Sequence, residues 1–139
     1  MRLWHQAMIK NLDNNRLVRQ HCECCALRGN GWGKPHATVN YVFKHSPIQL
    51  VLYHYLVYKE MLRRGYNFDS RWLNPAYRGS NCELNNTLTL DMVNKAIDDM
   101  KSNGISLIYA EHNTEYYEEC INNLKNKGVD ILKYRKELM

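Results

Sequence analysis

Residues 46–65, SPIQLVLYHYLVYKEMLRRG, carry the most regular helical pattern in the chain. Ser46 and Gln49 have the spacing of a capping box, and Pro47 stands at the first helical position, where its missing N–H costs nothing. Gly65 suits the turn that ends a helix. Between these signals, apolar side chains recur at intervals of three and four and predict one buried helical face: Ile48, Val51, Leu52, Tyr55, Leu56 and Leu62.

Further helices are predicted on both sides of this one. Asp13 can cap a helix over residues 14–28, which Gly29 ends in the usual manner of a C-terminal glycine. Two later helices are expected over residues 90–103 and 114–127, and Asn113 is the cap of the second. Short apolar runs over 105–109 and 128–132 flank the last helix, and they fit a small strand-helix-strand addition at the C-terminus.

Size and composition indicate one domain. The chain has 139 residues, a mass of 16.5 kDa and 45% hydrophobic residues, enough to bury a core of its own. The expected fold class is mainly α, a compact single helical domain over residues 1–139. Residues 1–104 form its helical body, and residues 105–139 form a C-terminal extension packed on that body.

Charge and hydropathy limit the partners. No apolar run approaches the roughly 18 residues that a membrane span needs, and the start of the chain is too polar for a signal peptide. The sequence therefore predicts a cytoplasmic protein with no membrane partner. The net charge of +5 and the pI near 9.0 favour an anionic partner.

Three of the five cysteines stand close together in RQHCECCALRG, residues 19–29. Within one helical turn, Cys22, Cys24 and Cys25 point in different directions and do not converge on a tetrahedral ion, so no metal is predicted. A cysteine nucleophile needs a base held against the thiol, and His21 points away from Cys22. The favoured interpretation is that Cys24 and Cys25 are reduced, small core residues.

Glu23, which stands among these cysteines, has two interpretations. Arg19 lies four residues earlier on the same helical face, the arrangement of an exposed ion pair. Alternatively, the helix presents the Glu23 carboxylate beside a basic surface. Basic residues gather near Trp32 and a glycine-rich loop, a combination that suits nucleic acid without being specific to it: Arg16, Arg19, Arg28 and Lys34.

Three segments, in this order and spacing, resemble the pyrimidine-dimer DNA glycosylase (endonuclease V) family of small helical domains. LDNNRLVRQHCE, residues 12–23, corresponds to a family helix and puts Glu23 where the catalytic glutamate belongs. Residues 36–67, from HATVN to RRGYN, resemble a His-x-Thr segment that leads into a long helix. NPAYRG, residues 74–79, resembles the family's Pro-x-aromatic-Arg-Gly.

The resemblance implies a DNA repair glycosylase with abasic lyase activity. Such enzymes attack the sugar of a damaged nucleotide with an amine, form an imine and break the strand by β-elimination. The pKa of an α-amino group is about 7.7 to 8.0, against about 10.4 for Lys, so the chain terminus supplies far more neutral amine at neutral pH. Arg2 is too large for the usual removal of the initiator Met. The resemblance therefore assigns catalysis to the Met1 amine and Glu23, with no cofactor.

The implied substrate is double-stranded DNA with UV-induced pyrimidine dimers. The candidate DNA contacts are basic side chains near Glu23: Arg2, Arg16, Arg19, Arg28, Lys34 and His36. Two family arginines fall on Cys22 and Ala26 in this sequence, and Arg19 and Arg28 are the candidates to replace them. Because of these losses, a non-catalytic nucleic-acid-binding protein of the same fold is the alternative, and a basic helical interaction module is a third possibility.

Overall fold

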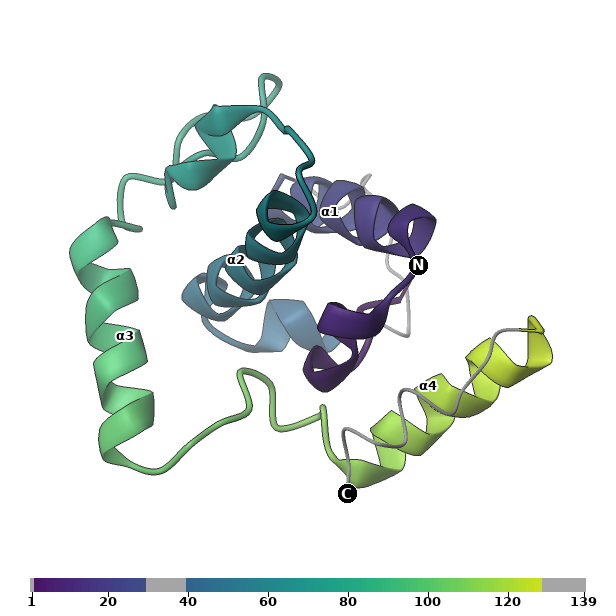
Figure 1. Ribbon diagram of the computed structural model, residues 1–139. Helices are drawn as coiled ribbons and strands as arrows, with labels where there is room; N and C mark the ends of the chain where they lie inside the picture. Colours follow the sequence, from purple (N-terminus) through teal and green to yellow (C-terminus); the bar gives the residue numbers. More distant parts are fainter. Residues whose placement is uncertain (1, 30–39, 129–139) are drawn as a thin grey trace.

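The computed structural model describes residues 2–29 and 40–128 of the chain. The first two of its long helices cross at the centre, and the other two lie on opposite sides of this pair (Figure 1). Of the described 3-10 segments, one precedes the first long helix, and the other two lie between the first and second and between the second and third. The elements of the described residues are, in order, η1 (Gln6–Asn11), α1 (Asn14–Arg28), η3 (Asn40–Lys44), α2 (Pro47–Arg63), η4 (Ser70–Leu73), α3 (Leu90–Ser102) and α4 (Thr114–Asn126).

The mainly α fold is confirmed, whereas the C-terminal strand addition is not supported. The described residues contain no strand, and residues 105–109 form an irregular connection between α3 and α4. Two glutamine side chains satisfy the backbone of Ile108 in place of a neighbouring strand: its N–H donates to Gln6 at 2.8 Å, and Gln49 donates to its carbonyl at 2.7 Å. The second expected strand, over 128–132, falls outside the described residues from 129 onward.

The helix ends follow the sequence signals in part. Asp13 and Asn113 cap α1 and α4 with their side chains, as predicted. Ser46 makes no side-chain capping bond, so the predicted capping box is wrong, although Pro47 does begin α2. Gly29 ends α1 with a φ of −77° and not in the left-handed region. Its small size is needed instead, because a Cβ there would lie 3.1 Å from the Arg78 carbonyl oxygen.

The buried face of α2 is rotated from the predicted one. Tyr55 and Leu62 are 40% and 53% exposed, whereas Tyr53 and His54 are fully buried. Helical spacing alone favoured Tyr55 over Tyr53 and left out His54, whereas in the fold tertiary hydrogen bonds satisfy the polar atoms of Tyr53 and His54 and allow both to be buried. The core also takes side chains from the N-terminal segment, α1 and α4, among them Leu3, Leu17, Cys24, Ile121 and Leu124.

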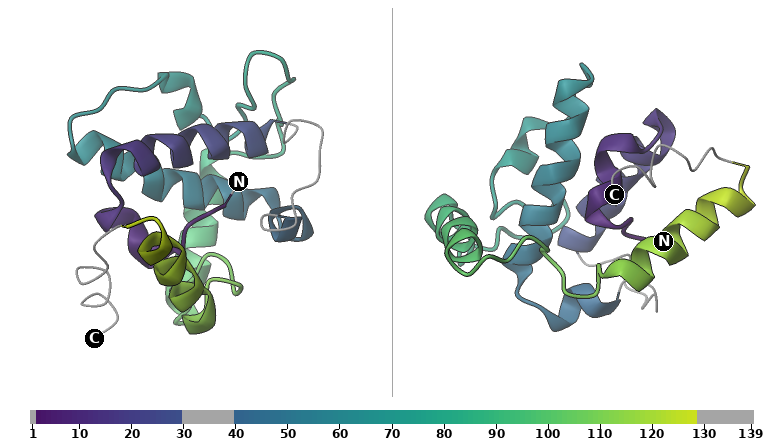
Figure 2. Two further views of the ribbon diagram at one scale, coloured as in Figure 1. Left: turned by 90° about the vertical axis from the view of Figure 1, so that its right-hand side faces the viewer. Right: turned by 60° about the horizontal axis from the view of Figure 1, so that its bottom comes forward.

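The N-terminal segment, residues 2–5, is fixed by three helices. It runs between α1 and α4 on its way to η1 (Figure 2). Tyr116 of α4 donates to the Leu3 carbonyl at 2.5 Å, and Tyr53 of α2 donates to the Trp4 carbonyl at 2.5 Å. Gln20 of α1 bonds both to this segment and to Glu23. The start of the described chain is therefore anchored inside the fold.

No described helix is both long enough and apolar enough to cross a membrane.

Candidate active site

Glu23 lies half-buried on α1, next to the start of the described chain. Gln20 donates to its Oε2 at 2.8 Å, and the backbone N–H of Arg2 is also hydrogen-bonded to the carboxylate. Burial raises the pKa of the Glu23 carboxyl, whereas the positive charge of the chain terminus, these two hydrogen bonds and Arg19 act to lower it. A carboxylate with these opposing influences can accept and return a proton.

The interpretation of Glu23 as Arg19's surface partner is not supported. Among the described residues, no ion pair within 4 Å joins the two side chains, and the Arg19 side chain is exposed. Glu23 turns instead toward the N-terminal segment, through Gln20 and the Arg2 backbone. A surface ion pair does not require these partners, so pairing with Arg19 does not explain the position of Glu23.

A hollow of about 330 Å³ opens beside this carboxylate. Four of the described side chains that line it are basic, and Glu23 is the one carboxylate among them. The basic groups include Arg16, which pairs with Asp13 at 2.8 Å. Such an excess of positive charge attracts an anionic ligand. The described lining consists of Arg2, Trp4, Arg16, Arg19, Gln20, Glu23, Asn123 and Lys127.

The aromatic ring of Trp4 joins the two sides of the hollow. The Arg2 guanidinium lies 5.9 Å from its ring centroid, and the Lys127 ammonium lies 5.6 Å from it. Both distances are in the range of cation–π attraction. Arg2 comes from the N-terminal segment and Lys127 from the C-terminal end of α4, so Trp4 holds together two cations that are far apart in sequence.

Sequence reasoning found only part of this site. It named Arg2, Arg16 and Arg19, which the structure brings together with Glu23. It missed Trp4, Gln20, Asn123 and Lys127. Trp4 and Gln20 are uncharged and give no signal of a site in the sequence, and nothing in the sequence of α4 shows that this helix packs against the N-terminal segment. The predicted site residues Met1, Lys34 and His36 lie outside the described residues.

Arg28 is not brought to the hollow. It is 7% exposed, and its guanidinium donates to the carbonyl oxygens of Trp72 at 3.0 Å, Asn74 at 2.8 Å and Pro75 at 3.2 Å. A buried guanidinium with these partners is not free to contact a DNA phosphate. The expectation that Arg28 replaces a lost family arginine is therefore not supported by its position.

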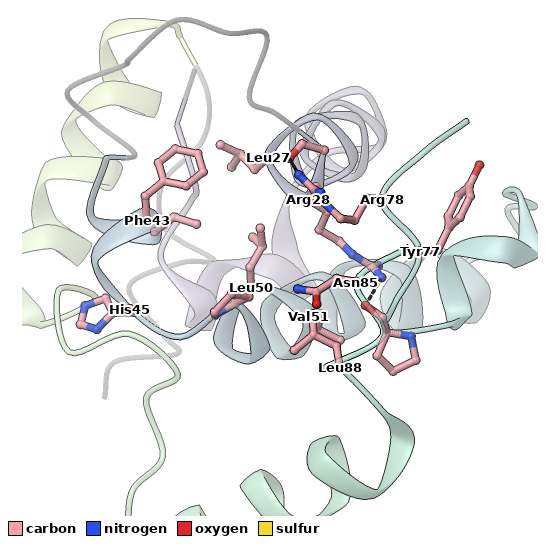
Figure 3. Close-up of a pocket in the computed structure, with 14 residues that line it drawn as sticks. Leu27, Arg28, Phe43, His45, Leu50, Val51, Tyr77, Arg78, Asn85 and Leu88 are labelled. Carbon is pink, nitrogen blue, oxygen red and sulfur yellow. Dashed lines mark hydrogen bonds between the residues drawn. The ribbon is translucent and has the colours of Figure 1, made fainter. Parts of the chain in front are cut away.

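Arg28 lines a different and larger hollow of about 470 Å³ (Figure 3). The described lining of this second hollow does not include Glu23. Arg78 lines it together with apolar side chains such as Leu27 and Leu50. Arg78 donates to the carbonyl oxygens of Arg28 at 3.0 Å and Gly29 at 2.9 Å. Arg28 and Arg78 thus tie the segment 72–79 to the end of α1, a structural role for the NPAYRG motif.

The cysteines pack largely as predicted. Cys24 is fully buried in the core, Cys25 is partly buried, and Cys22 is exposed. Cys25 does have a histidine neighbour, because His21 lies four residues before it, with Nε2 at 3.7 Å from the sulfur. Burial, however, raises the pKa of the Cys25 thiol to about 12, so almost no thiolate is present at neutral pH. Such a thiol is a poor nucleophile.

The same thiol belongs to a group that could hold a metal ion: ligand atoms of His21, Cys25 and His54 all lie within 4.8 Å of one another. The hydrogen bonds define a different arrangement. Arg28, a donor only, bonds His54 Nδ1 at 3.1 Å, so the proton of neutral His54 is on Nε2, which lies 2.8 Å from His21 Nδ1.

Because His54 donates to His21 Nδ1, the proton of neutral His21 is on Nε2, facing the Cys25 sulfur. The group is therefore a satisfied chain of donors and acceptors that runs from Arg28 to Cys25. A metal ion would have to displace the guanidinium of Arg28 and ionise a thiol whose pKa is raised, and both changes oppose binding.

A family model described as pyrimidine dimer DNA glycosylase matches residues 1–74, more than half of the 139-residue chain. The match includes α1, α2 and every described residue that lines the Glu23 hollow except Asn123 and Lys127. No curated protein and no solved structure matches the chain.

Proposed function

Since this chain belongs to the pyrimidine dimer DNA glycosylase family, we propose that it excises UV-induced pyrimidine dimers from double-stranded DNA and then cleaves the abasic strand. The observation that carries the proposal is the position of Glu23: its carboxylate is hydrogen-bonded to the Arg2 backbone, one residue from the chain's first amine, inside a basic hollow. A strong nucleophile for C1′ and a carboxylate that can move protons are the two groups that imine chemistry needs.

Covalent geometry supports the choice of nucleophile. The amine of Met1 is three bonds from the Arg2 nitrogen, so the two nitrogens are at most about 4 Å apart whatever the conformation of Met1. The Arg2 N–H is hydrogen-bonded to the Glu23 carboxylate. The proposal therefore places the amine on the side of Glu23, and the ordinary pKa of an α-amino group, about 7.7 to 8.0, leaves a useful neutral fraction at neutral pH.

The proposed reaction passes from amine attack through an imine to β-elimination. The neutral amine attacks C1′ of the damaged nucleotide, the glycosidic bond breaks, and the base leaves with the bonding electron pair and takes up a proton. Glu23 accepts the proton that the amine loses and returns it to O4′ as the C1′–O4′ bond breaks and the sugar ring opens. The carboxylate, ionised again, stabilises the cationic imine and can accept the C2′ proton. Removal of a C2′ proton then expels the 3′ phosphate by β-elimination, and water releases the protein from the cleaved strand.

The cations around the hollow position the DNA. Arg2, Arg16, Arg19 and Lys127 bring positive charge to the rim of the site, where phosphates flank a nucleotide whose C1′ faces Glu23. Such contacts fix register and orientation without reading sequence, which suits an enzyme that recognises a lesion. The damaged nucleotide or its partner must leave the stack, because C1′ is shielded in an intact duplex.

Imine trapping is the direct test. With sodium borohydride, the protein is expected to form a covalent adduct with an abasic duplex and with a UV-irradiated duplex, because reduction converts the transient imine into a stable amine. Selective acetylation of the α-amine should abolish the adduct, and mass spectrometry of the wild-type adduct should place the DNA on Met1. Full trapping by the acetylated protein would assign the nucleophile to a lysine. The absence of an adduct with either duplex would favour the non-catalytic binding protein.

The salt dependence of DNA binding tests the basic hollow. Lys127→Gln is expected to flatten the slope of log K against log salt by about 0.9, the value for one phosphate contact with its released counterion. Lys101→Gln is the control, since Lys101 is also an exposed lysine near the C-terminal end of a helix, α3, and lies outside the described lining of the hollow. Fluorescence anisotropy over a salt series measures both slopes. Equal slopes for the two variants would contradict the assignment of Lys127.

A further inference from the structure

Gln20 is fully buried and uses every hydrogen-bonding position of its side-chain amide. Its Nε2 donates to the Arg2 carbonyl at 2.9 Å and to Glu23 Oε2 at 2.8 Å. Its Oε1 accepts from the Trp4 N–H at 2.7 Å, and it shares the single Tyr53 hydroxyl proton, at 3.0 Å, with the Trp4 carbonyl at 2.5 Å. We propose that Gln20 is a positioning residue, which holds the first residues of the chain and the Glu23 carboxylate in one fixed geometry. The inference rests on the proposed function.

The backbone partners determine the orientation of the amide. The Trp4 N–H can only donate and the Arg2 carbonyl can only accept, so oxygen and nitrogen cannot be exchanged without breaking both bonds. The amide therefore pairs with residues 2 and 4 as a neighbouring strand would, through one acceptor and one donor two residues apart. The second N–H of the amide therefore points at Glu23. The position of the N-terminal segment in this way also determines the orientation of the Glu23 carboxylate.

Among the described side chains that anchor this segment, Gln20 is the one that also bonds Glu23. Tyr116 and Tyr53 also bond the segment, at the carbonyl oxygens of Leu3 and Trp4, but neither has a hydrogen bond to Glu23. An amide in the core is costly unless all its bonds are made, and an apolar side chain would fill the same space at less cost. This arrangement has a clear use if the amine and the carboxylate must be held to within a fraction of an ångström.

Gln6 provides a matched control inside the same protein. Its amide makes the same pair of backbone bonds two residues apart, to the Ser106 carbonyl at 2.8 Å and the Ile108 N–H at 2.8 Å. It anchors the connection before α4 and lies outside the described lining of the Glu23 hollow. Gln20→Met and Gln6→Met therefore remove the same kind of bonds with the same change of side chain, and only the first touches Glu23.

The experiment measures single-turnover borohydride trapping on an abasic duplex, with thermal melting and DNA affinity measured in parallel. Gln20→Met is expected to lower the trapping rate by about 30-fold or more while DNA affinity changes by less than about 3-fold, because the lost bonds act on orientation and not on phosphate contacts. Gln6→Met is expected to keep the trapping rate within about 2-fold of the wild type.

Two further readouts separate positioning from general damage to the fold. Loss of the Gln20 bond removes an influence that lowers the pKa of Glu23. The part of the acid limb of the pH–rate profile that Glu23 sets, as distinct from the part that the Met1 amine sets, should therefore move to higher pH in Gln20→Met and stay in place in Gln6→Met. Arg2, Arg16, Arg19 and Lys127, the other charged groups of the hollow, are unchanged in both variants. Adding Gln20→Met to Glu23→Gln should cost little more than Glu23→Gln alone, since both changes act on one carboxylate.

The outcomes separate the role of Gln20 from the proposed function. Wild-type trapping with an unimpaired Gln20→Met would overturn the role of Gln20 and leave the proposed function standing. Fully multiplicative effects in the double variant would also overturn it, because they show that Gln20 acts independently of Glu23. No trapping by the wild-type protein would overturn the proposed function and this inference together.

Discussion

Glu23→Gln is expected to lower the rate of imine trapping by about 100-fold or more, which corresponds to about 2.7 kcal/mol of transition-state stabilisation. The change keeps the size of the side chain and removes the negative charge and the proton-accepting oxygen. Affinity for DNA should change little, because the proposed phosphate contacts come from the surrounding cations. Single-turnover trapping and anisotropy titration on the same abasic duplex measure the two effects.

Glu119→Gln is the control for this prediction. Glu119 carries a carboxylate 3.5 Å from the Arg2 guanidinium, but it is 61% exposed and does not belong to the described lining of the hollow. Its replacement removes the same charge from the same neighbourhood, and the trapping rate should stay within about 3-fold of the wild type. Equal rate losses in the two variants would show that Glu23 contributes only general electrostatics and is not a catalytic residue.

The second large effect is a loss of stability in mild acid. His54 and His112 are both fully buried, and burial lowers the pKa of each, for His112 to about 3. In the unfolded chain both would titrate near 6.5. Between the lowered pKa of each histidine in the folded protein and its pKa of about 6.5 in the unfolded chain, the unfolded state binds more protons than the folded state. The stability that the neutral histidines provide is therefore complete above about pH 6.5 and is lost as the pH falls.

The hydrogen bonds explain why these rings resist protonation. The Gln6 N–H donates to His112 Nδ1 at 3.2 Å, so Nδ1 must keep its lone pair, and the other ring nitrogen lies 2.7 Å from the Tyr41 hydroxyl. His54 Nδ1 accepts a hydrogen bond from the Arg28 guanidinium at 3.1 Å in the same way. A second proton on either ring would place two donors against each other and bury an unpaired positive charge.

The free energy of unfolding should therefore fall by about 1.4 kcal/mol per pH unit for each of the two histidines, or about 2.7 kcal/mol per unit together. Urea unfolding at pH 7.5, 6.5, 5.75 and 5.0 measures the slope, in a range above the titration of the carboxylates. His112→Gln, which retains an acceptor and a donor, should reduce the slope below pH 6.5 by about 1.4 kcal/mol per pH unit. A free energy of unfolding that stays constant down to pH 5.0 would contradict the prediction.

Local signals in the sequence were sufficient to predict the helices. The caps at Asp13 and Asn113 and the proline at the start of α2 act through neighbouring backbone, so they can be recognised without knowledge of the fold. The same holds for Glu23, whose place in a family motif is a matter of order and spacing, and the family match over residues 1–74 confirms the family. The strand addition failed because a strand needs a distant partner, and Gln6 and Gln49 occupy that position at Ile108.

The composition of the site, in contrast, required the tertiary structure. Arg19 and Arg28 are both basic residues of α1, yet one is exposed at the Glu23 hollow and the other is buried against three carbonyl groups. Lys127 reaches the same hollow because α4 packs on the N-terminal segment through Tyr116. Gln20 looks like an ordinary helical residue in the sequence. Its four partners come from the N-terminal segment, α1 and α2, and only packing brings these elements together, because hydrogen bonds between distant residues leave no periodic trace in the chain.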